Sequence, residues 1–159
     1  MNNDIQKLYL DIASSVAAEL ADMPWVSTEY TFMAIARYSS QNGFFIDEFG
    51  QKSKTYAIES PGLEGFGLLR TAMAKLGSAW YTAIFRMTPD GKFNFEFDYD
   101  HLPAFDIVPS PSKWRDEFKQ YPRPELQAQI QDWMDSDEND ALHDEVVQRL
   151  ADLQRTSPT

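Results

Sequence analysis

Residues 92–100 alternate without exception between polar and aromatic side chains, and this pattern restricts the possible folds more than any other feature of the chain. The polar positions are Lys92, Asn94, Glu96, Asp98 and Asp100, and the aromatic positions are Phe93, Phe95, Phe97 and Tyr99. Successive side chains of a β-strand point to opposite faces of the sheet, so one face of this strand must be core and the other solvent. The segment therefore predicts an antiparallel strand in a sheet that is covered on one face.

The preceding segment supplies the partner of this strand. Residues 80–87 read WYTAIFRM and are rich in residues that favour strands, and Thr88-Pro89-Asp90-Gly91 follows them. Proline presets its own φ for a turn, and glycine accepts a positive φ. We therefore predict a hairpin over residues 80–100.

A second group of strands is predicted over residues 28–58. The runs TEYTFMAIARYS, GFFIDEF and KTYAIE are separated by Gln41-Asn42-Gly43 and by a turn around Gly50. Asn-Gly between two such runs is a strong hairpin signal. The segment is typical of a three-stranded antiparallel meander whose first turn is at Asn42-Gly43.

Two helices flank these strands. The first begins near Asn3 and ends at Asp22 to Pro24, and its buried stripe is predicted to be Ile5, Leu8, Tyr9, Ile12, Val16 and Leu20. The second begins at Ser60-Pro61 and ends at Gly77, with a predicted buried stripe of Leu63, Phe66, Leu69, Met73 and Leu76. Both stripes follow the helical spacing of three and four residues.

Helical patterns return after a proline-rich connector. They start at Ser110-Pro111, at Pro124 and at about Asn139, the last extending to Gln154. The order of elements indicates an α+β fold: an N-terminal helix, an antiparallel five-stranded sheet (βββ-α-ββ) covered by helices, and C-terminal helices. We expect a single domain over residues 1–159, with an acidic helical part at about 110–155.

Charge and cysteine content exclude several functions. The 159 residues carry a net charge of −11: residues 1–91 hold ten acids and seven bases, and residues 92–159 hold fifteen acids and seven bases. Such acidity argues against direct binding of nucleic acid and favours a basic partner. The absence of cysteine excludes disulfides, thiolate metal sites and a cysteine nucleophile. No apolar run is long enough for a membrane helix, and the N-terminus lacks signal-peptide character, so we expect a cytoplasmic protein without membrane contact.

Glu96, Asp98 and Asp100 form the first of two acidic candidate sites. They share one strand face, with successive side chains about 7 Å apart. Three interpretations are open: a solvated acidic face, a row that contacts a basic partner, or a metal or acid–base site completed by His101. The last of these would make the protein a metal-assisted hydrolase.

The second acidic candidate lies between Gln131 and Glu145, where seven acids occur without a single lysine or arginine. This run is either a solvated helical surface or a binding surface, since like charges so close together repel one another unless a partner offsets them. Trp133 and Met134 are either core residues or anchors of a contact surface. The candidate residues of this run are Asp132, Trp133, Asp135, Asp137, Glu138, Asp140 and Asp144.

Two motif matches are rejected. The run beginning at Asp135 resembles a calcium loop, but Asp140 stands where glycine is required and Val146 where a bidentate glutamate is required. Gly62, Gly65 and Gly67 resemble a phosphate-binding loop, but no strand directly precedes them in the required way. We predict no cofactor, no metal ion and no catalytic residue.

The chain resembles the YezG-like immunity proteins, which are antitoxins of bacterial polymorphic toxin and contact-dependent inhibition systems. The resemblance covers roughly residues 3–105 and rests on two motifs. The first is an L-Y-x-x-I-A helix at Leu8, Tyr9, Ile12 and Ala13, and the second is a G-K-x-x-x-x-F-D-Y strand at Gly91, Lys92, Phe97, Asp98 and Tyr99. The C-terminal helices match only in being helical and acidic.

This resemblance implies a protein without catalytic activity that binds and neutralises the C-terminal domain of a cognate toxin, commonly a nuclease. A nuclease that holds nucleic acid is basic, so an acidic inhibitor would associate with it rapidly and occlude its substrate cleft. The expected contacts are the acids of residues 132–144, with Glu96, Asp98 and Asp100 as a second row. The alternatives are the hydrolase described above and an acidic adaptor for another basic protein.

Overall fold

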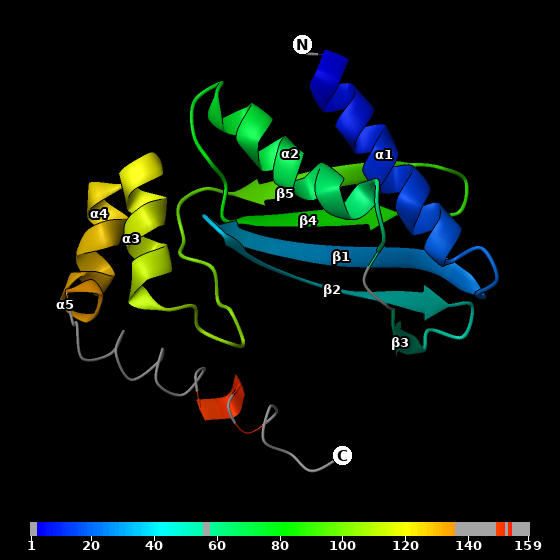
Figure 1. The fold of residues 1–159 in the computed structure, drawn as a ribbon. Coiled ribbons are helices and arrows are strands. Elements are labelled where there is room, and N and C mark those ends of the chain that lie inside the picture. Colours follow the sequence, from blue (N-terminus) through cyan, green and yellow to red (C-terminus); the bar gives the residue numbers. More distant parts are fainter. Residues whose placement is uncertain (1–2, 56–57, 136–148, 152, 154–159) are drawn as a thin grey trace. The chain divides into compact units, whose positions relative to one another are not determined.

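The computed structural model describes residues 3–55, 58–135, 149–151 and 153 (Figure 1). The chain divides into two compact units. The first unit comprises Met1–Ala34 and Ser39–Ala104, and the second comprises Ile35–Tyr38 and Phe105–Thr159. The predicted single domain over the whole chain stays a prediction.

The first unit contains a five-stranded antiparallel sheet, as predicted. Its strands have the spatial order β3-β2-β1-β4-β5. Their bounds are Trp25–Ile35 (β1), Tyr38–Asp47 (β2), Lys52–Lys54 (β3), Thr82–Met87 (β4) and Phe93–Asp98 (β5). The third strand is predicted over the run KTYAIE (54–59), but it lies earlier in the chain and shares only Lys54 with that run; Thr55, Ile58 and Glu59 are not in a strand, and residues 56–57 lie outside the described residues.

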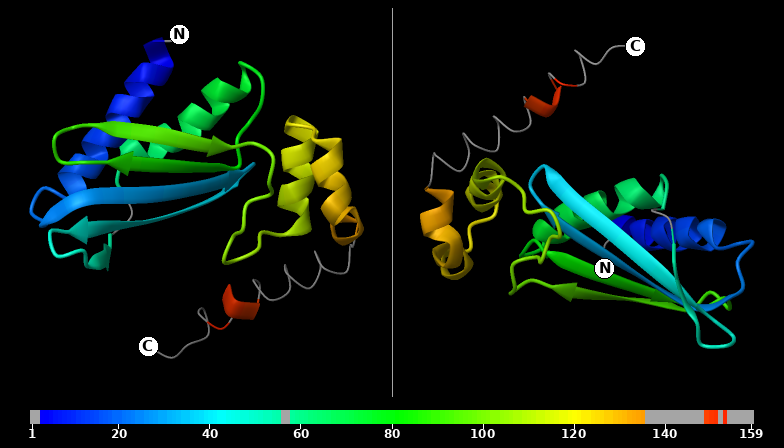
Figure 2. Two further views of the ribbon diagram at one scale, coloured as in Figure 1. Left: turned by 180° about the vertical axis from the view of Figure 1, so that it is seen from behind. Right: turned by 90° about the horizontal axis from the view of Figure 1, so that it is seen from below.

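Helices α1 (Asn3–Glu19) and α2 (Gly62–Ala74) lie on the same face of this sheet (Figures 1 and 2). The α+β prediction is therefore confirmed. The core between helices and sheet includes Ile12, Val16 and Phe85, each fully buried, and the ring of Phe32 stacks on that of Phe66 at 4.7 Å. Burying one such side chain stabilises the fold by roughly 1.5–3 kcal/mol. Among the described residues, no helix has the length and apolar character needed to cross a membrane.

The predicted buried face of α1 is confirmed, but that of α2 is partly wrong. Phe66 and Leu69 are fully buried, whereas Leu63 is 41% exposed and Leu76 is 70% exposed. The buried face of α2 is rotated toward two glycines, Gly62 and Gly65, and toward Arg70.

The glycines of α2 set how closely this helix approaches α1. A Cβ atom on Gly62 would lie 2.5 Å from the Cβ of Ser15, and one on Gly65 would lie 3.1 Å from Ile12 Cγ1. The N–H of Gly62 also donates to Ser15 Oγ at 2.9 Å. The glycine-rich run that superficially resembles a phosphate loop is therefore a helix-packing surface.

The predicted turn at Asn42-Gly43 is wrong, because both residues lie inside β2. The chain reverses instead at Ala36-Arg37, where Arg37 has φ 62°. Glycine at position 43 allows the side chains of Thr55 and Tyr30 to pack closely against the backbone. A Cβ there would lie 2.5 Å from Thr55 Oγ1 and 2.7 Å from the ring of Tyr30. By contrast, the turns at Gly50 (φ 78°) and Gly91 (φ 89°) are as predicted, since both glycines occupy the left-handed region.

The second unit is built on α3, which spans Pro111–Gln120. Within this unit, Ala36 N–H donates to Oε1 of the fully buried Glu117 at 2.8 Å, and Arg37 pairs with Asp116. These bonds hold a non-glycine residue in the left-handed region, so a tertiary contact decides where the hairpin turns. Local sequence alone could not reveal such a contact.

The predicted helix from Pro124 onward is broken into three short pieces. They are α4 (Pro124–Gln127), the 3₁₀ turn η1 (Ala128–Ile130) and α5 (Gln131–Met134). Ile130 has φ −126° and ψ 17°, which interrupts the helical backbone before α5. Most of the predicted helix from Asn139 to Gln154 lies outside the described residues.

The glycine packing of α2 yields a matched pair of stability predictions. Gly62→Ala should lower the free energy of unfolding by about 1–3 kcal/mol, because its methyl group meets Ser15. Gly67→Ala, on the same helix with nothing within 4 Å of the added atom, should raise it by about 0.5–1 kcal/mol. Urea denaturation measures both, and a Gly62→Ala variant as stable as the parent would contradict the packing described.

Candidate functional site

The acidic row of β5 lies on the sheet face opposite the helices. Phe93, Phe95 and Phe97 pack against the core, so the side chains between them point to the other face. Glu96 is exposed on that face and Asp98 is partly buried, whereas Asp100 is exposed in the bend that follows the strand. The structure thus places Glu96 and Asp98 on one side of the sheet, and Asp100 lies beyond the strand.

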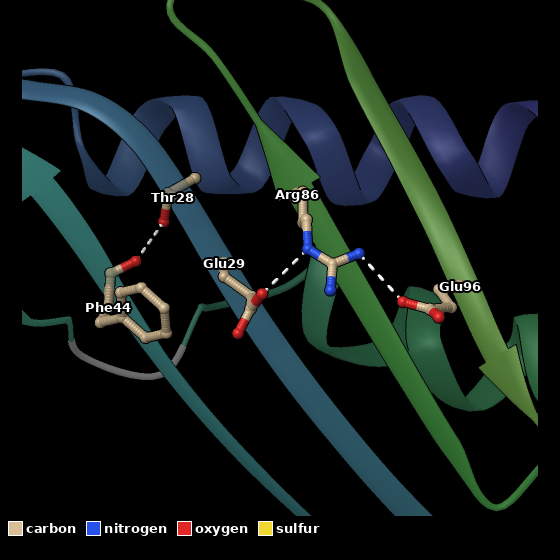
Figure 3. A network of polar contacts seen from close by, with 5 residues as sticks. All are labelled: Thr28, Glu29, Phe44, Arg86 and Glu96. Atoms are coloured by element: carbon tan, nitrogen blue, oxygen red, sulfur yellow. Dashed lines mark hydrogen bonds and ion pairs between the residues drawn. The ribbon is translucent and has the colours of Figure 1, made fainter.

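Glu96 is held by a cation from the neighbouring strand (Figure 3). Arg86 of β4 donates from Nη1 to Glu96 Oε2 at 3.0 Å and from Nε to Glu29 Oε1 of β1 at 2.9 Å. The register explains this bridge, because Arg86 is directly paired with Glu29 across the β1–β4 ladder. The hydrogen bonds that Arg86 donates to Glu96 and Glu29 raise its pKa, and the formal charges of the three groups sum to −1.

Asp98 is engaged by the turn that follows β5. Its Oδ1 accepts the backbone N–H groups of Asp100 at 2.9 Å and His101 at 3.1 Å, and its Oδ2 lies 3.0 Å from His101 Nδ1. Partial burial raises the pKa of Asp98, but the hydrogen bonds from Asp100 and His101 outweigh it, so the pKa lies below its ordinary value. Asp98 therefore caps the strand end.

The same geometry bears on the hydrolase interpretation. Glu96 turns toward Arg86, whereas Asp98 turns toward His101. Across residues 3–55, 58–135, 149–151 and 153, no three carboxylate or imidazole side chains gather in an arrangement that could hold a metal ion. The side chain of His101 is 82% exposed, so no buried pocket surrounds the pair.

The second acidic candidate begins on α5. Asp132 and Asp135 are exposed, Trp133 is half-buried and Met134 is 1% exposed, so Met134 is a core residue of this unit. Asp135 accepts a hydrogen bond from Gln131 Nε2 at 2.8 Å. Four more predicted site residues, Asp137, Glu138, Asp140 and Asp144, lie outside the described residues.

The bases near α5 do not neutralise its acids. Arg115 of α3 donates to the backbone carbonyl of Met134, and Arg123 pairs with Glu125 at 2.7 Å. In the described part of the chain, no base lies within ion-pair distance of Asp132 or Asp135. Both carboxylates are therefore exposed to solvent without a neutralising base in the described part of the chain.

Two depressions of the first unit were not predicted from sequence. An apolar one of about 470 Å³ lies between the start of α1, the end of α2 and the end of β5, where Tyr9, Leu76 and Tyr99 line it. Burial raises the pKa of both tyrosines, and Tyr9 stacks on Phe95 at 4.4 Å. The other, of about 460 Å³, includes Glu29 and Arg86 in its lining. The helical spacing predicts a buried Leu76, whereas its exposed side chain lines the first depression.

Comparisons with known proteins do not assign a family. No model of a protein family matches the chain, and no curated protein matches it significantly.

The lowered pKa of Asp98 predicts a pH-dependent contribution to stability. A carboxylate whose pKa is lower in the folded state stabilises the protein above its unfolded pKa, about 3.9, and loses this effect as the pH falls through the folded value. Asp98→Asn should therefore be less stable than the parent at pH 7, and the difference should narrow below about pH 4. Urea denaturation from pH 2 to 7 measures this difference, and a difference independent of pH would contradict the role assigned to the charge.

Proposed function

We propose that the chain is a cytoplasmic immunity protein of the YezG-like kind, which binds and neutralises the basic toxin domain of a polymorphic toxin or contact-dependent inhibition system. The proposed toxin is a nuclease, and the proposed mode of inhibition is occlusion of its substrate cleft. The observation that carries this proposal is the exposure of Asp132 and Asp135 without a neutralising base among the described residues.

A nuclease cleft that holds phosphates is lined with lysine and arginine, and it attracts an acidic surface over a distance of about 10 Å at moderate salt. A net charge of −11 speeds such an encounter. Because no base among the described residues pairs with Asp132 or Asp135, these carboxylates can pair with a partner without breaking an ion pair of the described part of the chain.

The two groups of acidic residues have different roles in the proposed complex. Glu96 shares Arg86 with Glu29, and Asp98 caps the strand end, so part of their charge serves the fold. The surface that begins at Asp132 is therefore the proposed primary contact, with Trp133 as its aromatic anchor. In the sequence, four further acids of the predicted contact follow, namely Asp137, Glu138, Asp140 and Asp144.

A growth experiment tests the proposal. The product of the adjacent gene is expressed from an inducible promoter, with or without this chain on a second plasmid. An immunity protein should restore growth against that product, and it should give no protection against an unrelated nuclease toxin. Loss of growth despite stable co-expression would contradict the proposal, and binding to a basic protein that is harmless to the cell would favour the adaptor instead.

If Asp132 and Asp135 are part of the primary contact, removing their charges should slow association with the toxin domain. Asp132→Asn combined with Asp135→Asn should slow association with the catalytically inactivated toxin domain by about three- to tenfold at low salt, and the effect should fade near 0.5 M salt. The matched control combines Asp22→Asn with Glu48→Gln, which removes two exposed charges from the first unit. Stopped-flow fluorescence measures both rates, and an equal effect of the two double variants would place the contact elsewhere.

A further inference from the structure

Strand β5 forms one edge of the sheet, and its outward backbone groups belong to three phenylalanines. Thr88 N–H donates to the carbonyl of Lys92 at 3.0 Å, and Tyr81 N–H donates to that of Asp98 at 2.8 Å. In an antiparallel strand, alternate residues direct both backbone groups to the same side, so the even-numbered residues face β4. Phe93, Phe95 and Phe97 therefore direct their N–H and C=O groups away from the sheet. Within the described residues, no hydrogen bond reaches these groups.

The two edges of the sheet differ in how they are protected. The opposite edge, β3, has three residues, all exposed, and lysines at both ends. Short length and lysine are common devices that keep an edge strand from pairing with other chains. By contrast, β5 has six residues and contains neither lysine nor proline. The edge open to an additional strand is therefore β5.

The side chains of β5 indicate what such a strand would contain. On the helix-covered face, an added strand would lie beside the half-buried rings of Phe93, Phe95 and Phe97. On the other face, it would lie beside Glu96 and Asp98. Cross-strand neighbours of opposite charge attract, and apolar neighbours pack, so the best fit alternates apolar and basic side chains.

The apolar depression at the end of β5 strengthens this assignment. It lies on the helix-covered face, where Tyr99 at the end of the strand meets Tyr9 and Leu76. Its volume of about 470 Å³ is large enough for an apolar side chain of an added strand. The exposed Leu76 would be covered by the same contact.

We propose that β5 is a strand-addition site for an extended segment of the basic partner, with alternating apolar and basic residues. This inference rests on the proposed function for the identity of the partner, the toxin domain. A second copy of this chain is a poorer occupant, because antiparallel pairing of two β5 strands would bring the Glu96 and Asp98 side chains of both copies together.

The first experiment tests the edge independently of any toxin. The probe is the peptide acetyl-Lys-Val-Lys-Val-Lys-Val-Lys-amide, and the readout is amide hydrogen exchange by NMR. At about ten times its Kd, the peptide should slow exchange at Phe93, Phe95 and Phe97 by about tenfold. The same peptide with glutamate for lysine should not do so. The proposal would be overturned if the basic peptide did not slow amide exchange at these residues, or if it slowed exchange at Lys52–Lys54 instead. It would also be overturned if the acidic peptide slowed exchange equally.

A matched pair of variants tests the position. Asn94→Lys places a cation on the exposed side of β5 and should raise the Kd of the basic peptide by about threefold. Asn42→Lys makes the same change on the inner strand β2 and should leave the Kd unchanged. If both variants raised the Kd equally, the change would reflect the overall charge of the protein, and the proposed site on β5 would be wrong. Protection that rises with protein concentration alone, together with dimerisation in ultracentrifugation, would overturn it in favour of a second copy.

The toxin complex separates this inference from the proposed function. If growth rescue succeeds but the three amides of β5 exchange freely in the complex with inactivated toxin, the immunity role holds and the strand-addition site is wrong. If rescue fails while the basic peptide still protects the three amides, the strand-addition site holds and the immunity role is wrong.

Discussion

The first unit depends on one constraint, which is that the side chains of a strand alternate between two faces while helices cover only one of them. The aromatic residues of β4 and β5 are thereby directed to α1 and α2, and rings such as Phe85 and Phe95 lie 4.9 Å apart beneath these helices. The same alternation directs every intervening side chain to the open face. Glu29, Arg86 and Glu96 meet on the open face because they lie in three adjacent strands and their side chains all point to that face.

This constraint also explains which parts of the fold could be predicted from sequence. The period of two in residues 92–100 predicts the strand and its faces, and the spacing of Ile12 and Val16 predicts the buried side of α1. Asn42-Gly43 misled the prediction, because a glycine required for close packing beside Tyr30 looks the same in sequence as a glycine required for a turn. The actual turn depends on bonds from α3 to Ala36 and Arg37, about 80 residues away in the chain.

The sequence predicts which acidic residues the candidate sites contain, but it does not predict which groups these residues contact. Sequence shows that Glu96 and Asp98 share a face, but it cannot show that Arg86 bridges Glu96 to Glu29, since that contact depends on the register of three strands. Sequence likewise shows the acidic run after Gln131, but the buried state of Met134 and the exposure of Asp132 follow from packing. The residue types of β5 do not show that its backbone groups point away from the sheet. That follows only from the position of β5 at the edge in the strand order.

Together these features describe a protein whose charge has two uses. Acids on the sheet contribute to the fold through Arg86 and the turn after β5, whereas Asp132 and Asp135 face solvent and are proposed to meet a basic partner. The affinity for the purified, inactivated product of the adjacent gene, measured by calorimetry from 50 mM to 500 mM salt, tests this account most directly. The account predicts a one-to-one complex whose association constant falls steadily as salt rises. Absence of binding, or an association constant that does not change with salt, would contradict it.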